Sequence, residues 1–359
     1  MRIAFFGSSL VSAYWNGAAT YYRGLLRAMA ARGHDITFCE PDAFERQRHR
    51  DIDDPDWCRV IVYPATESAM LDALGAARDA DVIVKASGVG VFDDLLEEAV
   101  LQVRRPGALA IFWDVDAPAT LDRLEGGTDP FAELIPEYDM VLTYGGGPRV
   151  VESYLRWGAR ACVPIYNALD PATHCPVAPD PRWACDLLFI GHRLPDRQAR
   201  IRDFFLGAAV AAPHRRFLLG GNGWASEALP GNVKPIGHVF THQHNLLNGS
   251  ALAVLNVNRD SMAAFGWSPP TRVFEVAGAA GCLITDAWEG IEAFLTPGEE
   301  VLVAASGMEV ASLLEELSPR RARAIGEAAH RRVLAEHTYA QRAELVERVL
   351  DGRHAEVPA

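Results

Sequence analysis

Short apolar segments alternate with helical stretches along almost the whole chain, and this alternation limits the fold more than any other feature. In the first half, the segments that predict buried strands are 2–6, 34–39, 60–63, 81–85, 108–112, 140–143 and 162–165. Helical stretches lie between them, roughly at 18–32, 66–78, 92–104 and 147–157. Strands joined by helices pair in parallel, because the crossover returns the chain to the same edge of the sheet. The sequence therefore predicts an α/β fold with parallel sheets.

The same alternation continues in the second half, so the chain has material for two domains. Strands are predicted at 186–190, 217–219, 235–239, 251–257, 282–285 and 299–303, and the last helices at 307–317, 319–336 and 339–351. A chain of 359 residues is longer than one typical domain. Four prolines at 171, 176, 179 and 181 indicate a stiff linker. We therefore expect one Rossmann-like domain over 1–174 and a second over 175–337.

Composition excludes some classes of function. The formal net charge is −13, and only Lys85 and Lys234 are lysines. An acidic chain does not bind nucleic acid through bulk charge, although local arginines can still bind phosphate. The six cysteines have no metal-like spacing. No signal peptide is recognised at the first residues and no apolar run has the length of a membrane span, so we expect a cytoplasmic protein.

The segment 251–286 carries the strongest functional pattern. A buried strand at 251–257 is followed by a loop, and Ser268-Pro269-Pro270-Thr271 is typical of a helix start, with a hydroxyl cap and a proline in the first turn. Arg272 and Glu275 then share one face of a helix over 272–280. A helix N-terminus with an arginine suits a phosphate, and a carboxylate can accept hydrogen bonds from both hydroxyls of a ribose. The pattern fits a nucleotide, and spacing alone equally allows a surface Arg–Glu pair.

Polar residues also follow other predicted strands, at the carboxyl edge where ligands bind in doubly wound sheets. Gly191 ends one strand, and Arg197 lies in the first turn of the next helix, which is an anion-binding pattern. Asp114 and Asp116 follow another strand and are candidate general bases. Asp116 has a second explanation, as the cap of a helix that begins at Pro118. Two carboxylates at this spacing do not form a metal cage, and we predict no metal site.

The segment Glu275-Val-Ala-Gly-Ala-Ala-Gly-Cys-Leu-Ile-Thr-Asp286 resembles the donor site of GT-B glycosyltransferases of the group 1 type. Together with Leu255–Arg259, Ser268–Glu275 and Asp286–Gly290, it is similar to the CgeB-like branch of that group. The resemblance implies two Rossmann-like doubly wound parallel-sheet domains that face each other across a cleft. It also implies a C-terminal helix, 338–352, that packs back on the N-terminal domain.

In such enzymes the donor is a nucleotide-diphosphate sugar of the UDP or GDP type, and no further cofactor is expected. The resemblance implies that Glu275 holds the ribose and that His238 lies near the base. The expected contacts of the diphosphate come from Gly17, Gly191, Arg197, Arg259, Ser268, Thr271 and Arg272. Many retaining relatives carry a second glutamate where this chain has Trp267. Because the second domain lacks that group, we expect the catalytic carboxylate to be Asp114 or Asp116, with a slight preference for Asp114.

The predicted activity is transfer of a sugar to an unidentified acceptor, which could be a glycan, a small molecule or a protein. Two alternatives share the architecture. One is a sugar-nucleotide epimerase of the non-hydrolysing type, and the other is a nucleotide-binding protein without turnover.

Overall fold

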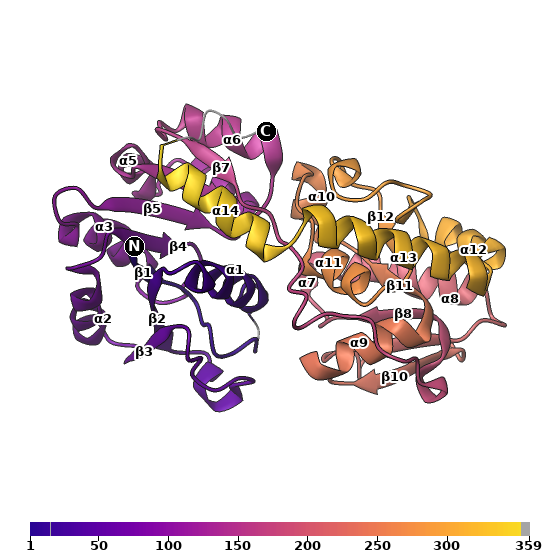
Figure 1. Cartoon of the computed structure of the whole chain (residues 1–359). Helices are drawn as coiled ribbons and strands as arrows, with labels where there is room; N and C mark the ends of the chain where they lie inside the picture. The colour runs from indigo at the N-terminus through magenta and orange to yellow at the C-terminus, as the bar shows by residue number, and fades with distance from the viewer. Residues whose placement is uncertain (15, 353–359) are drawn as a thin grey trace. The chain divides into compact units, whose positions relative to one another are not determined.

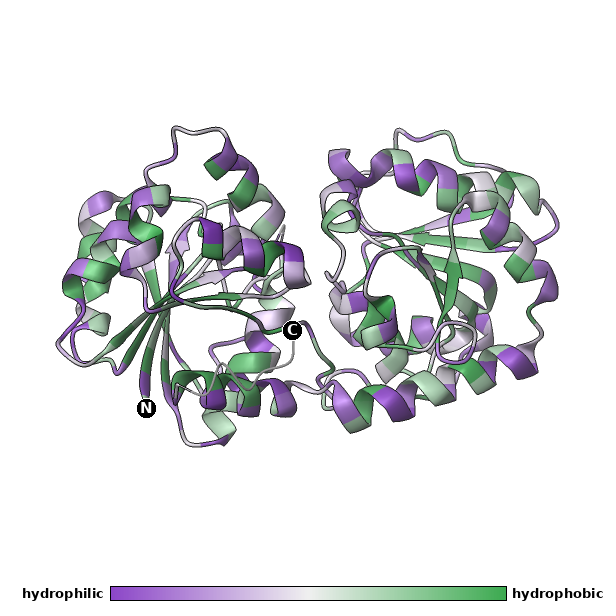
Figure 2. Ribbon diagram, turned by 90° about the horizontal axis from the view of Figure 1, so that it is seen from above, coloured by the Kyte–Doolittle hydropathy of each residue, from purple (hydrophilic) through white to green (hydrophobic). Residues whose placement is uncertain are grey.

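The computed structural model describes residues 1–14 and 16–352, which form two compact units (Figure 1). The first unit comprises residues 1–167 and the chain from Tyr339 onward, and the second comprises residues 168–338. Each unit is a parallel sheet with helices on both faces, and the strands are the most hydrophobic part of each unit (Figure 2). The predicted fold class, two α/β domains with parallel sheets, is confirmed.

The first unit has a seven-stranded sheet in the order β3-β2-β1-β4-β5-β6-β7. Its strands are β1 (Arg2–Phe6), β2 (Asp35–Asp42), β3 (Arg59–Pro64), β4 (Val82–Ala86), β5 (Leu109–Asp114), β6 (Met140–Thr143) and β7 (Cys162–Pro164). Its helices are α1 (Ala19–Ala31), α2 (Glu67–Ala73), α3 (Asp93–Val103), α4 (Ala117–Glu125), α5 (Phe131–Leu134), α6 (Gly147–Arg156) and α14 (Tyr339–Leu350), with short 3₁₀ turns at 46–49, 74–77 and 135–137. The strand order reverses between β1 and β4, as in a doubly wound fold.

The second unit has a six-stranded sheet in the order β10-β9-β8-β11-β12-β13. Its strands are β8 (Cys185–Ile190), β9 (Phe217–Gly220), β10 (Val233–Gly237), β11 (Ala251–Asn256), β12 (Leu283–Asp286) and β13 (Leu302–Ala304). Its helices are α7 (Pro195–Ile201), α8 (Ala208–Ala211), α9 (Thr241–Ser250), α10 (Asp260–Phe265), α11 (Thr271–Gly278), α12 (Gly307–Glu316) and α13 (Pro319–Glu336). A π-helical segment, 202–207, joins α7 to α8, and 3₁₀ turns lie at 181–183 and 291–293. Here the order reverses between β8 and β11.

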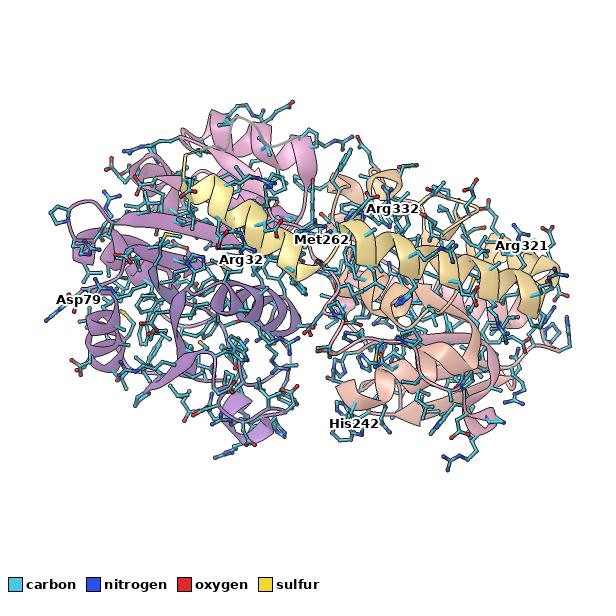
Figure 3. All side chains as sticks on the ribbon, in the orientation of Figure 1. Arg32, Asp79, His242, Met262, Arg321 and Arg332 are labelled. Atoms are coloured by element: carbon cyan, nitrogen blue, oxygen red, sulfur yellow. The ribbon has the colours of Figure 1, made fainter. Side chains whose placement is uncertain are left out.

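The last helix, α14, packs against α1 within the first unit. Gly24 of α1 lies directly beneath the ring of Tyr339, where a Cβ atom would come within 2.2 Å of the ring. At the other end of the contact, Arg32 donates to Glu347 at 2.6 Å and to Glu344 at 3.3 Å (Figure 3). Close helix–helix contact therefore depends on a glycine and is flanked by ion pairs.

Two local predictions were wrong. The segment after β11, predicted as a loop, forms α10, which begins after Arg259 and ends at Gly266, with φ +74°. Strand β2 was predicted to end at 39, yet it continues through Pro41 to Asp42 and pairs with β3 there. Proline is accommodated because the pairing of β2 with β1 has already ended at Cys39, so no ladder hydrogen bond is lost.

None of the helices in the described part of the chain combines the length and apolar character needed to cross a membrane.

Candidate functional site

The strand order of the second unit reverses between β8 and β11, and polar loops follow both strands at that point. In doubly wound sheets, ligands bind beyond the carboxyl ends of the strands at such a reversal. The loop after β8 begins with Gly191, whose N–H donates to Gly220 O at 2.9 Å. Gly221 has φ +113°, and a Cβ atom there would lie 2.2 Å from Gly191 O. The close approach of the loops after β8 and β9 therefore requires this glycine.

Two arginines lie over one aromatic ring at this edge of the sheet. The guanidinium carbons of Arg197 and Arg272 are 5.6 and 5.2 Å from the ring centroid of Phe189. Burial lowers the pKa of Arg197 to about 10, and the neighbouring charge of Arg272 adds to the effect. Burial also lowers the pKa of Arg272. Two half-buried cations held this close repel each other, and a bound anion would relieve the repulsion.

The other arginines near this edge are paired with carboxylates. Arg259 donates to Asp196 of α7, and its charge also contributes to the lowered pKa of Arg197. Arg193 lies 3.4 Å from Glu227 and donates to Ser226 Oγ at 2.9 Å. Arg272, in contrast, has no ion-pair or hydrogen-bond partner among the residues that the structure describes. The anion-binding capacity is therefore concentrated on Arg197 and Arg272.

Glu275 lies one turn into α11, beside Arg272 and two histidines. Burial is the largest single influence and acts to raise the pKa of Glu275, yet the net shift is a lowering. The causes that together outweigh burial are the charges of His174, His244 and Arg272 and a hydrogen bond from Thr271. The nearest oxygen of Glu275 is 3.7 Å from His244 Nδ1. The side chain keeps 13% exposure and is ionised at neutral pH. It is therefore able to accept hydrogen bonds from a ligand that reaches the start of α11.

The start of α11 differs from the sequence prediction. Its N-cap residue is Pro270, and no side chain makes a capping hydrogen bond there. The hydroxyl of Ser268, predicted as the cap, is buried and donates instead to Gly266 O at 2.9 Å. That prediction was wrong because the two prolines extend the backbone and carry Ser268 away from the first turn. The first turn of α11 is therefore left without a side-chain cap.

Trp267 occupies the position where the resemblance described above implies a glutamate in many retaining relatives. Its φ is +46°, and its N–H donates to Glu289 O at 2.6 Å. The indole lies against Gly290, where a Cβ atom would come within 2.5 Å of the ring. Trp267 thus fixes the loop before α11 against the segment after β12.

His238 lies on the loop after β10 and is exposed. Its ring is 4.5 Å from that of Phe240 and 6.2 Å from that of His192. Burial lowers the pKa of His192, and the charges of His238, Arg197 and Arg272 lower it further. The structure thus gathers His238, Gly191, Arg197 and Arg272 at one edge of the second sheet, with Glu275 following on α11.

The predicted carboxylates of the first unit lie in different environments. Asp114, at the end of β5, is fully buried and accepts four hydrogen bonds, from Ser87 Oγ at 2.7 Å, Asp116 N at 2.9 Å, Thr120 Oγ1 at 3.2 Å and Tyr154 Oη at 2.5 Å. Burial raises its pKa. Asp116 is half-buried and precedes α4, but its side chain makes no capping hydrogen bond. Gly17, also in the first unit, is exposed in the turn before α1.

The histidines beside Glu275 were missed by the sequence prediction. His174 lies in an irregular loop about a hundred residues before Glu275, and His244 lies on α9. Neither has a motif around it, so only the tertiary structure brings them to α11.

Comparison with known proteins identifies the fold. Residues 197–348 match the family model described as glycosyl transferase-like, which is less than half of the chain. No match was found among curated proteins. Among solved structures, sucrose-phosphate synthase from Thermosynechococcus elongatus is similar over 99% of this chain and 100% of its own, with a TM-score of 0.71 and 15% identity. The fold is GT-B.

Two further GT-B structures carry a nucleotide sugar. HepE of Anabaena in complex with UDP-glucose matches 98% of this chain and 100% of its own, with a TM-score of 0.70 and 12% identity. An α-glucosyltransferase in complex with UDP-glucose and DNA containing an abasic site matches 98% of this chain and 99% of its own, with a TM-score of 0.72 and 12% identity. At these identities the likeness establishes the fold and leaves the substrates of this chain open.

Proposed function

We propose that the protein is a glycosyltransferase that moves a sugar from a nucleoside-diphosphate sugar to an acceptor. The observation that carries the proposal is the pair of arginines over Phe189, with the Glu275 carboxylate one turn along the same helix as Arg272. Cations at a helix N-terminus suit a diphosphate, and a carboxylate at that distance suits the hydroxyls of a ribose. The match of residues 197–348 to a glycosyl transferase-like family supports the same reading.

Each group has a proposed role in holding the donor. Arg197 and Arg272 bind the diphosphate, and the uncapped first turn of α11 with Thr271 adds backbone N–H donors. Glu275 accepts from the ribose, and His238 lies on the base side. Arg259 contributes charge, although Asp196 already neutralises part of it. Ser268 acts indirectly, because its hydrogen bond to Gly266 O fixes the loop before α11. Gly191 has no side chain, which leaves space for the diphosphate.

The proposed mechanism needs no metal ion, because arginines and the N-terminus of a helix can stabilise the charge that develops on the leaving diphosphate. UDP is the first nucleotide to test, since HepE and the α-glucosyltransferase were solved with UDP-glucose. A hexose donor, the CgeB-like branch, a cytoplasmic location and the contact of Gly17 with the donor stay predictions. The acceptor is not identified.

Of the two carboxylates, Asp116 is now the better candidate for the base that activates the acceptor. All four donors to Asp114 are groups of the first unit itself, so its carboxylate already links β5 with α4 and α6 through hydrogen bonds. A general base must reach the proton it removes. Asp116 is half-buried, at the carboxyl edge of the sheet, and its side chain has no capping role.

A thermal-shift screen of nucleotides and nucleotide sugars tests the proposal. A ligand at a hundred times its Kd adds about 2.7 kcal/mol to the stability of the unit that binds it. We expect UDP or GDP, and their sugars, to raise the Tm more than the corresponding nucleosides do. If no nucleoside diphosphate shifts the Tm, the donor site is not where we place it.

Product analysis then separates the rival activities. Incubation of the preferred donor alone should leave its sugar unchanged, because an acceptor is needed for transfer. Formation of an isomeric nucleotide sugar from donor alone would instead identify an epimerase. Strong nucleotide binding without any product, over a broad panel of acceptors, would favour a binding protein.

A further inference from the structure

Three side chains that commonly bind metal ions meet in the second unit, in a cluster formed by His174, His244 of α9 and Glu275 of α11. One ligand atom of each lies within 4.8 Å of the other two. His244 Nδ1 is 3.7 Å from Glu275 Oε2, and the two imidazole rings are 6.1 Å apart. Two histidines and one carboxylate are the protein ligands of one class of open zinc site.

The loop that carries His174 is held firmly against both helices. The carboxylate of Asp170 accepts from Ala172 N at 3.1 Å and from Thr173 Oγ1 at 2.9 Å, which closes the turn before His174. The side-chain amide of Asn245, on α9, donates to Thr173 O at 2.9 Å. On the side of α11, a Cβ atom at Gly278 would lie 3.0 Å from His174 O. The ring is therefore positioned by contacts outside the cluster.

The surroundings of the His174 ring also suit metal binding. His174 is only 2% exposed, and its Nε2 has no hydrogen-bond partner among the residues that the structure describes. A buried nitrogen without a partner is costly, and such an atom calls for a ligand.

We propose that His174, His244 and Glu275 form a binding site for one Zn²⁺ ion, with a fourth position open to water or an anion. Ligand atoms in a tetrahedral zinc site lie about 3.4 Å apart, given zinc–ligand distances of about 2.0–2.2 Å. The pair of His244 and Glu275 is already close to this spacing at 3.7 Å. The remaining contraction needs side-chain rotations of His244 and Glu275, which keep 20% and 13% exposure.

Zinc binding has a consequence for the nucleotide, and this consequence rests on the proposed function. A carboxylate that coordinates zinc has fewer lone pairs and less negative charge left for the two hydroxyls of a ribose. Zn²⁺ and the nucleoside diphosphate should therefore compete, and zinc should act as an inhibitor. The metal site itself does not depend on the protein being a glycosyltransferase.

The direct test uses the full chain, stripped of metal, with Zn²⁺ for calorimetry and Co²⁺ for absorption spectroscopy. We expect one Zn²⁺ per chain, and intense visible bands that mark four-coordinate cobalt. His244→Gln and Glu275→Gln should weaken Zn²⁺ binding at least tenfold and remove the bands. His242→Gln is the matched control, because His242 lies exposed at the start of the same helix (Figure 3) and should bind as the parent does.

The outcomes separate the two proposals. Unchanged Zn²⁺ affinity in folded His244→Gln, checked by circular dichroism, or weak six-coordinate cobalt bands in the parent, would overturn the metal site. UDP is then titrated into the cobalt-loaded chain, with UDP and cobalt alone as the blank. Loss of the protein bands as UDP binds supports the shared carboxylate. A chain that binds UDP but no zinc rejects the metal site alone, and one that binds zinc but no nucleotide rejects the proposed function alone.

Discussion

Arg197 and Arg272 are held against the same aromatic ring, that of Phe189, although they belong to different helices of the second unit. Phe189 lies near the end of β8, where the strand order reverses, and its ring sets the spacing of the two guanidinium groups. Both arginines are partly buried, and burial is the main cause that lowers the pKa of each. Such an arrangement is electrostatically unfavourable without an anion, which is why we place the diphosphate there.

Replacing either arginine with lysine should weaken nucleotide binding. Lysine keeps the charge but loses the planar fork that binds two phosphate oxygens at once. Loss of one charge-assisted hydrogen bond costs about 1.5–3 kcal/mol, which is roughly tenfold to a hundredfold in affinity. Calorimetry with UDP measures this for Arg197→Lys and Arg272→Lys. Arg193→Lys is the control, because Arg193 pairs with Glu227 and should leave the affinity unchanged. Equal affinities in all three variants would place the diphosphate elsewhere.

Glu275→Ala should weaken nucleotide binding by at least about tenfold, since it removes the acceptor for the ribose hydroxyls. The comparison that isolates this role is UDP against 2′,3′-dideoxy-UDP, which lacks both hydroxyls. The parent should bind UDP much more tightly than the dideoxy analogue, and Glu275→Ala should bind the two alike. A variant that still distinguishes them would show that another group reads the ribose.

Much of this architecture can be predicted from the chain itself, and the reasons for success and failure are physical. Alternating strands and helices fix a parallel sheet, and a spacing of three places Arg272 and Glu275 on one helix face. The position of His174 depends on a turn closed by Asp170 and on the missing side chain of Gly278, and no local pattern encodes either. The burial of Asp114 was equally hidden, because its donors come from the loop after β4, from the start of α4 and from α6.

The two aspartates of the first unit should respond differently to replacement by asparagine. Asp116→Asn removes the proposed base, so turnover should fall about 10²–10⁴-fold. Stability should be kept, because the Asp116 side chain makes no capping hydrogen bond to α4 and asparagine has nearly the same size. Asp114→Asn should mainly lower stability, by about 1–3 kcal/mol, because an amide cannot accept from all four buried donors. Turnover with saturating donor, together with urea unfolding, measures both effects. Full turnover in Asp116→Asn would favour a mechanism without an enzymic base.

The contact between α1 and α14 should weaken in acid, with Glu347 as its sensitive group. A hydrogen bond from Arg32 is the main cause that lowers the pKa of Glu347 to about 2, from an ordinary value of 4.5. A carboxylate with a lowered folded pKa stabilises the fold fully above its unfolded pKa, and the contribution is lost as the pH falls from about 4.5 toward 2.

Glu347→Gln should therefore lower the Tm at pH 7, and the difference from the parent should shrink as the pH falls through that range. The pair is near the surface, so the expected loss is at most about 1 kcal/mol. Thermal unfolding at pH 7, 4.5 and 3, followed by circular dichroism, measures it. Glu336→Gln is the matched control, since Glu336 pairs with Arg332 within one exposed helix of the second unit. A Tm difference for Glu347→Gln that is constant over this pH range would mean that the side chain acts through packing rather than through its charge.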